Sequence, residues 1–168
     1  MIRRPMQPGD APGLAALVRA CDETYREWAP AGWEPPQIMP GWAESFLAPD
    51  RWTQVRVDGD ALVGVVSFRQ AHEQSAPGPG HGPPLDGVAH LSILFVHPSR
   101  WRQGIASSML DDAEAALDAR GYRRAVLWTP EGAPAERLYA ARGWERDGRR
   151  AWHPWVGLTV VGYTRDLT

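Results

Sequence analysis

The chain begins with an apolar pattern that has the period of a helix. Its apolar positions recur at i, i+3, i+4 and i+7: Leu14, Leu17, Val18 and Cys21. This spacing predicts an amphipathic helix that begins after an N-cap at Gly9-Asp10 and follows a short strand over residues 2–6. The segment 28–40 is rich in Pro, Gly and Trp, so we expect a structured loop there, followed by a short helix over 41–47.

The next apolar runs have the length and composition of strands. Residues 52–57 and 62–68 flank an acidic glycine turn over 58–60, a pattern that predicts an antiparallel hairpin. Pro and Gly then crowd residues 75–87, which argues against a helix or a central strand and predicts a mobile surface loop.

The second half alternates strand and helix signals. Residues 88–96 are continuously apolar, as in a strand buried on both faces, and Gly121 and Gly143 stand where two amphipathic patterns end. The elements predicted are a strand over 88–96, a helix over 104–120, a strand over 124–129, a helix from Pro134 to Gly143, and strands over 144–146 and 156–165. This order, after a hairpin, predicts a mixed α/β sheet flanked by helices.

Composition narrows the class of protein. A chain of 168 residues fits a single domain over 1–168, and a formal net charge of -2 argues against a nucleic-acid partner. Cys21 is the single cysteine and cannot form an internal disulfide, which suits a reducing compartment. The chain has neither a signal-peptide pattern nor a membrane-spanning apolar run, so we expect a cytoplasmic protein without a membrane partner.

The most informative segment is the turn between the apolar strand 88–96 and the helix 104–120. A helix N-terminus offers free backbone amides and positive potential, and Gly104 and Ala106 would let an anion approach them. Arg100, Arg102 and the hydroxyls of Ser107-Ser108 are further donors, so a pyrophosphate is the expected occupant. The alternative is an ordinary strand-to-helix turn with one glycine.

Two motifs resemble the GCN5-related N-acetyltransferase (GNAT) superfamily. The first is Val96-His97-Pro98 followed by Trp101-Arg102-Gln103-Gly104-Ile105-Ala106, which departs from the family at Trp101. The second, about 30 residues on, runs from Ala135 to Trp144 and includes Leu138, Tyr139 and Gly143, with Gly132 where the family often has Asn.

This resemblance implies the GNAT fold and acetyl-CoA as acyl donor. The expected fold is a mixed, mostly antiparallel sheet of about seven strands, splayed after the fourth strand and flanked by about four helices. The resemblance assigns the pantetheine arm to the backbone of Leu94, Phe95 and Val96. It assigns the pyrophosphate to Arg102, Gln103, Gly104, Ile105, Ala106 and Ser107.

The resemblance also implies three catalytic candidates. His90 falls where the family often has a Glu base, and Ser92 lies on the same strand to position a water or the substrate. Tyr139 would protonate the departing thiolate. The alternatives are that His90 is a strand histidine held by a neighbour and that Tyr139 only packs against the sheet.

The acceptor is the least determined part. We expect a primary amine of a small molecule; a protein lysine or N-terminal amine, or a non-catalytic acyl-CoA-binding domain, stays open, as does a homodimer. Trp28, Trp33, Trp42, Trp152 and Trp155 would either wall an acceptor pocket, with Glu34, Glu44 or Glu73 attracting an ammonium group, or anchor loops. The histidines have no zinc-like spacing, so no metal is predicted.

Overall fold

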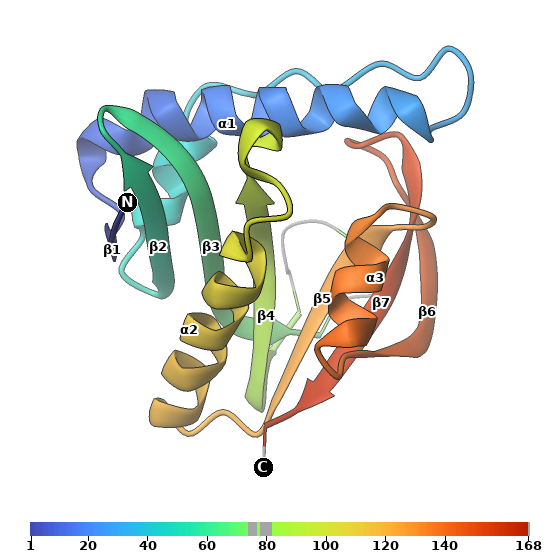
Figure 1. The fold of residues 1–168 in the computed structure, drawn as a ribbon. Coiled ribbons are helices and arrows are strands. Elements are labelled where there is room, and N and C mark those ends of the chain that lie inside the picture. Colours follow the sequence, from blue (N-terminus) through green and yellow to red (C-terminus); the bar gives the residue numbers. More distant parts are fainter. Residues whose placement is uncertain (74–76, 78–81, 168) are drawn as a thin grey trace.

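The computed structural model describes residues 1–73, 77 and 82–167. Their strands form one seven-stranded sheet in the order β1-β2-β3-β4-β5-β7-β6 (Figure 1). Neighbouring strands are antiparallel except β4 and β5, which are parallel. The strands are β1 (Ile2–Pro5), β2 (Arg51–Asp58), β3 (Ala61–His72), β4 (Pro84–Val96), β5 (Arg124–Pro130), β6 (Glu145–His153) and β7 (Leu158–Asp166).

Helices cover both faces of this sheet. Helix α1 (Ala11–Glu23) and the 3-10 helix Ala43–Leu47 pack on one face, whereas α2 (Ile105–Ala119) and α3 (Ala135–Ala141) pack on the other. Each face has its own buried core, because alternate residues of a strand point to opposite sides. Within the described residues, no helix is long and apolar enough to cross a membrane.

Beta strands β4 and β5 separate soon after they pair. Their register covers only Val88–His90 against Arg124–Val126, although β4 continues to Val96 and β5 to Pro130. Figure 1 shows the two strands diverging beyond this short pairing, with α2 and α3 on either side of the opening. The expected splay after the fourth strand is therefore confirmed, and beyond His90 no strand of the described residues pairs with this edge of β4.

Most elements lie where the apolar patterns predicted them, and the corrections are local. The loop expected over 75–87 is wrong at its end, because Pro84 to Gly87 belong to β4; most of its other residues lie outside the described ranges. Proline is tolerated at the first position of a strand, where no ladder donor is required. Three α-helices and four short 3-10 helices are found in the described residues, against about four helices expected.

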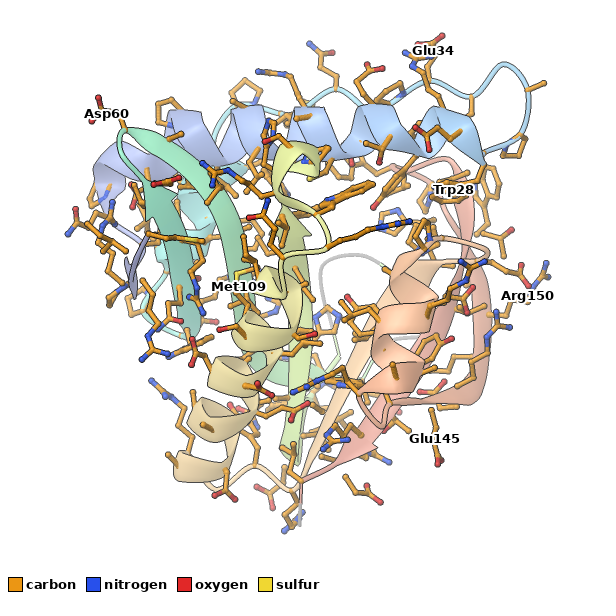
Figure 2. The ribbon with its side chains drawn as sticks, viewed as in Figure 1. Trp28, Glu34, Asp60, Met109, Glu145 and Arg150 are labelled. Atoms are coloured by element: carbon orange, nitrogen blue, oxygen red, sulfur yellow. The ribbon has the colours of Figure 1, made fainter. Side chains whose placement is uncertain are left out.

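The first of the last two strands is longer than its pattern indicated. The strand expected over 144–146 runs from Glu145 to His153, and most of its side chains are exposed. As an edge strand it needs no apolar alternation, and its register shifts between Arg146 and Arg150 around Gly148, whose φ is 87°. Arg150 and Glu145 accordingly project from the outer edge of the molecule in Figure 2.

A glycine allows α2 to approach the sheet closely. A Cβ atom at Gly64 of β3 would lie 3.1 Å from the sulfur of Met109, a tighter contact than side chains normally make. Met109 is fully buried, and Figure 2 shows it on the α2 side of β3. The packing fixes α2, and with it the turn that precedes α2, relative to β4.

Candidate active site

The free edge of β4 presents backbone groups to the opening between β4 and β5. The His97 N–H donates to the Val63 carbonyl of β3 at 2.9 Å. Because successive residues of a strand direct their amides to alternate sides, Phe95 also faces β3, whereas Leu94 and Val96 face the opening. Of the three residues expected to hold the pantetheine arm, Leu94 and Val96 are thus the pair with backbone groups toward the opening.

The turn before α2 has the geometry of an anion site. Gly104 is the N-cap of α2 in the left-handed region, with φ 78°, and a Cβ there would meet nothing within 4 Å. The first amides of this 15-residue helix have no partners within the helix, and its dipole is positive at this end. Arg102 and Gln103 are exposed beside it, Ala106 and Ser107 are half-buried, and the side chain of Ile105 anchors the first turn in the core.

Trp101 holds this turn against the end of β4. Its Nε1–H donates to the Val96 carbonyl at 2.8 Å, and the buried thiol of Cys21 donates to the same oxygen at 3.2 Å. Burial raises the pKa of Cys21 to about 12, so the thiol stays protonated and able to donate. The departure from the family motif at Trp101 therefore has a structural role, which could not be predicted from the motif alone. Arg100 forms an ion pair with Asp58, which leaves Arg102 as the arginine of this turn without such a pair within the described residues.

Tyr139 lies on the α2 and α3 side of the opening. Its ring is buried and tilted against those of Trp144 and Tyr163, each at 5.9 Å between centroids. The Tyr163 hydroxyl donates to Glu136 at 2.7 Å, whereas no partner for the Tyr139 hydroxyl is found among the described residues. Burial raises the pKa of Tyr139, so its phenol is neutral and can donate a proton.

His90 lies on the opposite face of β4. Its neighbours Ala89 and Leu91 point into the core beneath α2, which directs His90 toward the other side of the sheet. Burial, reinforced by the charges of Arg69, Arg149 and Arg51, lowers the pKa of His90 to about 4. The imidazole is therefore neutral near pH 7.

Ser92 connects His90 to a basic neighbour. Its hydroxyl lies 3.4 Å from Nδ1 of His90, and the Arg51 guanidinium donates to that hydroxyl at 3.1 Å. The register of β3 and β4 shifts here between Leu91 and Ile93, so Ser92 occupies a bulge. The structure thus brings two of the sequence-predicted catalytic residues together on one face.

A cavity of about 350 Å³ opens beside His90 on this face. Its lining includes Arg69, Arg124 and Arg149, together with Glu73 and Asp147. Sequence reasoning missed these arginines, because they come from β3, β5 and β6 and meet only through strand register. The only sign of them in the sequence was that these arginines alternate with core residues along their strands.

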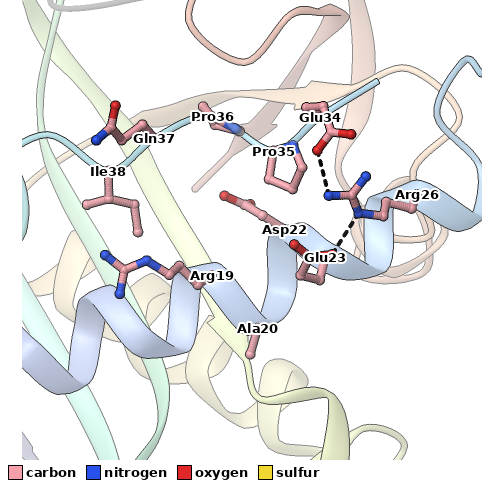
Figure 3. Close-up of a pocket in the computed structure, with 10 residues that line it drawn as sticks. All are labelled: Arg19, Ala20, Asp22, Glu23, Arg26, Glu34, Pro35, Pro36, Gln37 and Ile38. Carbon is pink, nitrogen blue, oxygen red and sulfur yellow. Dashed lines mark hydrogen bonds and ion pairs between the residues drawn. The ribbon is translucent and has the colours of Figure 1, made fainter. Parts of the chain in front are cut away.

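A second cavity, of about 550 Å³, lies elsewhere. It is formed by α1 and residues 34–38, and Figure 3 shows the Arg26 guanidinium between Glu23 and Glu34, with both ion pairs at 2.7 Å. Its lining comes from α1 and the loop that follows, and two of the lining residues, Ala20 and Asp22, flank Cys21, whose thiol donates to the Val96 carbonyl at the end of β4. Glu34, expected to attract an ammonium group, is engaged with Arg26.

The tryptophans of the first-half loops pack against neighbouring aromatic rings and against the turn between β6 and β7. Trp42 lies 6.2 Å from Trp155 between ring centroids, and Trp33 donates to the Val156 carbonyl at 2.9 Å. The ring of Trp28, labelled in Figure 2, is tilted against that of Tyr25 at 4.9 Å between centroids. Neither cavity is lined by a tryptophan, whereas Trp152 is 61% exposed. Loop anchoring accounts for the contacts of Trp33 and Trp42.

The family is decided by comparison with known proteins. Residues 16–144 match the model of the acetyltransferase (GNAT) family. The chain belongs to this family. No curated protein matches this GNAT chain closely enough to count as a relative.

Solved GNAT structures share the fold over nearly the whole chain. An N-acetyltransferase from Staphylococcus aureus Mu50 is 18% identical, covers 99% of this chain and 98% of its own, and superposes with a TM-score of 0.71. The ribosomal-protein-S18-alanine N-acetyltransferase from Escherichia coli is 14% identical, covers 99% of this chain and 94% of its own, and has a TM-score of 0.68. An aminoglycoside 6'-N-acetyltransferase complexed with coenzyme A is 17% identical, covers 100% of this chain and 98% of its own, and has a TM-score of 0.70. These neighbours act on a protein and on a small molecule, so the fold by itself leaves the acceptor of this chain undetermined.

Proposed function

We propose that this chain is an acetyl-CoA-dependent N-acetyltransferase that acetylates a primary amine of a small molecule. The observation that carries the proposal is the opening between β4 and β5, which joins a free strand edge to the N-terminus of α2. Acetyl-CoA has its thioester at one end of the pantetheine arm and its pyrophosphate at the other, so it needs a strand edge for the arm followed by an anion site for the pyrophosphate. An ordinary strand-to-helix turn would need neither of these features.

The donor would be held mainly by backbone. The amides of Leu94 and Val96 face the opening for the pantetheine arm, and the amides from Gly104 to Ser107 converge for the pyrophosphate. The residues fit such a group, because the position of a Gly104 Cβ is open and Arg102 is exposed beside it. Acetyl-CoA supplies an acetyl group on a good leaving group, and a backbone N–H of β4 would polarise its carbonyl.

Proton movement is assigned to side chains on opposite faces of the opening. The Tyr139 phenol, neutral and without a partner among the described residues, would protonate the departing thiolate. On the other face, neutral His90 would accept the proton that the amine loses, directly or through a water held by Ser92. The positive potential around His90 also favours the neutral form of a nearby amine, which is the form that attacks.

A small acceptor is favoured over a protein segment by the size of the cavity beside His90. At about 350 Å³ it is near the lower end of ligand pockets, which suits a compact molecule. A protein acceptor would instead require an extended groove across this face.

Calorimetric titration with acetyl-CoA tests the donor site, with Gly104→Glu as the blocking variant. The new carboxylate would repel the pyrophosphate, so we expect micromolar binding to the unaltered protein and at least a 30-fold loss in the variant. Gly121→Glu is the matched control: Gly121 has φ 79° and open space around its Cβ position, but it follows the other end of α2, about 20 Å away at 1.5 Å per residue. Equal binding by all three proteins would refute the proposed site.

A further inference from the structure

Arginines stand side by side across the sheet on the face that holds His90. Arg51 of β2 is the register partner of Arg69 of β3, and Arg69 is the register partner of His90 of β4. The next residue in this row is Val126 of β5. Like charges directly opposite one another destabilise a sheet, so a pair of arginines here has a cost that the fold itself does not explain.

Most arginines on this face have no ion-pair partner among the described residues. Asp147 pairs with Arg149 at 2.7 Å, but no ion pair is found for Arg51, Arg69 or Arg124 in the ranges that the structure describes. The residues outside those ranges carry no acidic side chain. Burial and the charge of Arg69 lower the pKa of Arg51, against the opposing effect of Asp50.

Two buried donors on this face also lack acceptors. Nε of Arg69 and Nε1 of Trp128 are fully buried, and neither has a hydrogen-bond partner among the described residues. Trp128 follows Val126 by two positions on β5, so it shares this face, and the Arg149 guanidinium lies 4.4 Å above its ring. Buried donors without acceptors are rare, and both groups can only donate.

We propose that this row and the adjoining cavity bind an anionic group of the acceptor, so that the acceptor amine carries a carboxylate or a phosphate. The inference rests on the proposed function and specifies its substrate class. Arginine pairs with planar carboxylates and with phosphates through two parallel hydrogen bonds, and the volume of about 350 Å³ suits a molecule the size of an amino acid. A polyamine or another polycation would meet like charge here.

This anion site is distinct from the turn before α2. His90 precedes Val96 by six residues on β4, which is about 20 Å at 3.3 Å per residue, and the α2 turn lies beyond Val96. The row also faces the side of the sheet away from α2. The donor pyrophosphate therefore leaves these arginines free for the acceptor.

Matched pairs of amines test the inference: L-phenylalanine with phenethylamine, L-lysine with cadaverine, and O-phosphoethanolamine with ethanolamine. With acetyl-CoA, we expect kcat/KM to favour the anionic member of at least one pair by 10-fold or more, and the pair that responds identifies carboxylate or phosphate. Arg69→Gln and the exposed Arg124→Gln should each reduce that preference at least fivefold. Arg150→Gln removes the same charge outside the cavity and should leave it unchanged.

A binding measurement separates this inference from the proposed transfer. N-acetyl-L-phenylalanine and N-acetylphenethylamine differ only in the carboxylate, and their calorimetric titration requires no turnover. Tighter binding of the carboxylated probe, with that preference lost in Arg124→Gln, supports the anion site. If at the same time no amine is acetylated, the proposed acetyl transfer is refuted and the anion site is not. Equal binding of the two probes together with preferred turnover of cadaverine or ethanolamine would overturn the inference.

Discussion

Arg69 on β3 and His90 on β4 are register partners, and both side chains line the same cavity. Burial, and after it the charges of Arg69, Arg149 and Arg51, lower the pKa of His90 to about 4. A histidine in this state is a neutral acceptor across the physiological pH range, in contrast to an ordinary histidine, which is partly charged below pH 7.

The first prediction concerns the titration of His90. Its folded pKa of about 4 lies below the ordinary value of 6.5, so its contribution to stability is present above pH 6.5 and is lost as the pH falls through 4. The full effect is about 3 kcal/mol. We expect NMR titration to place the His90 inflection near 4 in the unaltered protein and at least one unit higher in Arg69→Gln. An inflection near 6.5 in both proteins would contradict the electrostatic coupling.

The second prediction separates Tyr139 from its neighbour. Tyr139→Phe should lower kcat by about 100-fold, the scale of a lost general acid, while acetyl-CoA affinity changes less than threefold. Tyr163→Phe is the control: it removes a hydroxyl from the same aromatic cluster, but one that donates to Glu136, so stability should fall by about 1 to 2 kcal/mol with kcat nearly unchanged. A similar kcat in both variants would leave Tyr139 with a packing role only.

The residues of the proposed donor site could be named from the sequence because they lie in local motifs. Gly104, Ala106 and Tyr139 fall in two short motifs, and the elements that carry them lie where their apolar patterns predicted. In the proposed acceptor half, His90 and Ser92 were named from the sequence, whereas the arginines beside them were not. Arg51, Arg69 and His90 are far apart in the chain, and only the register of three strands, including a bulge at Ser92, brings them into one row.

Strand register also determines which charged groups lie next to His90. The sequence offered tryptophans that would suit an apolar, planar or cationic acceptor, with Glu34, Glu44 or Glu73 to attract an ammonium group. In the structure Glu34 is paired with Arg26, whereas Glu73 lines the cavity next to His90 together with arginines that the sequence did not place there. Polar residues that alternate with core residues carry little information until the partner strands are known.

The third prediction tests how Trp101 positions the turn before α2. Trp101→Phe keeps the ring but loses the hydrogen bond to the Val96 carbonyl, which contributes about 1 kcal/mol. Because a less ordered turn must be fixed on binding, acetyl-CoA affinity should fall about fivefold in calorimetry. Trp152→Phe, at an exposed tryptophan of β6, should leave affinity unchanged. Unchanged affinity in Trp101→Phe would show that the backbone alone fixes the turn.

The fourth prediction concerns Asp22, a buried carboxyl group of α1 at the larger cavity (Figure 3). Burial, and secondarily the charge of Glu23, raises its pKa from 3.8 to about 7. The folded state therefore holds a proton that the unfolded state releases, and this contribution to stability is fully present below pH 3.8 and is lost as the pH rises through 7. At pH 8 the ionised carboxylate then costs about 2 to 4 kcal/mol.

Asp22→Asn removes that charge while keeping the shape of the side chain. We expect urea unfolding at pH 8 to show a variant more stable than the unaltered protein by 1 kcal/mol or more, with the difference reversing or vanishing at pH 5, where Asp22 is already protonated. Glu23→Gln changes an exposed carboxylate one position away and should shift stability by less than about 0.5 kcal/mol at either pH. A pH-independent effect of Asp22→Asn would mean that packing, and not ionisation, governs this position.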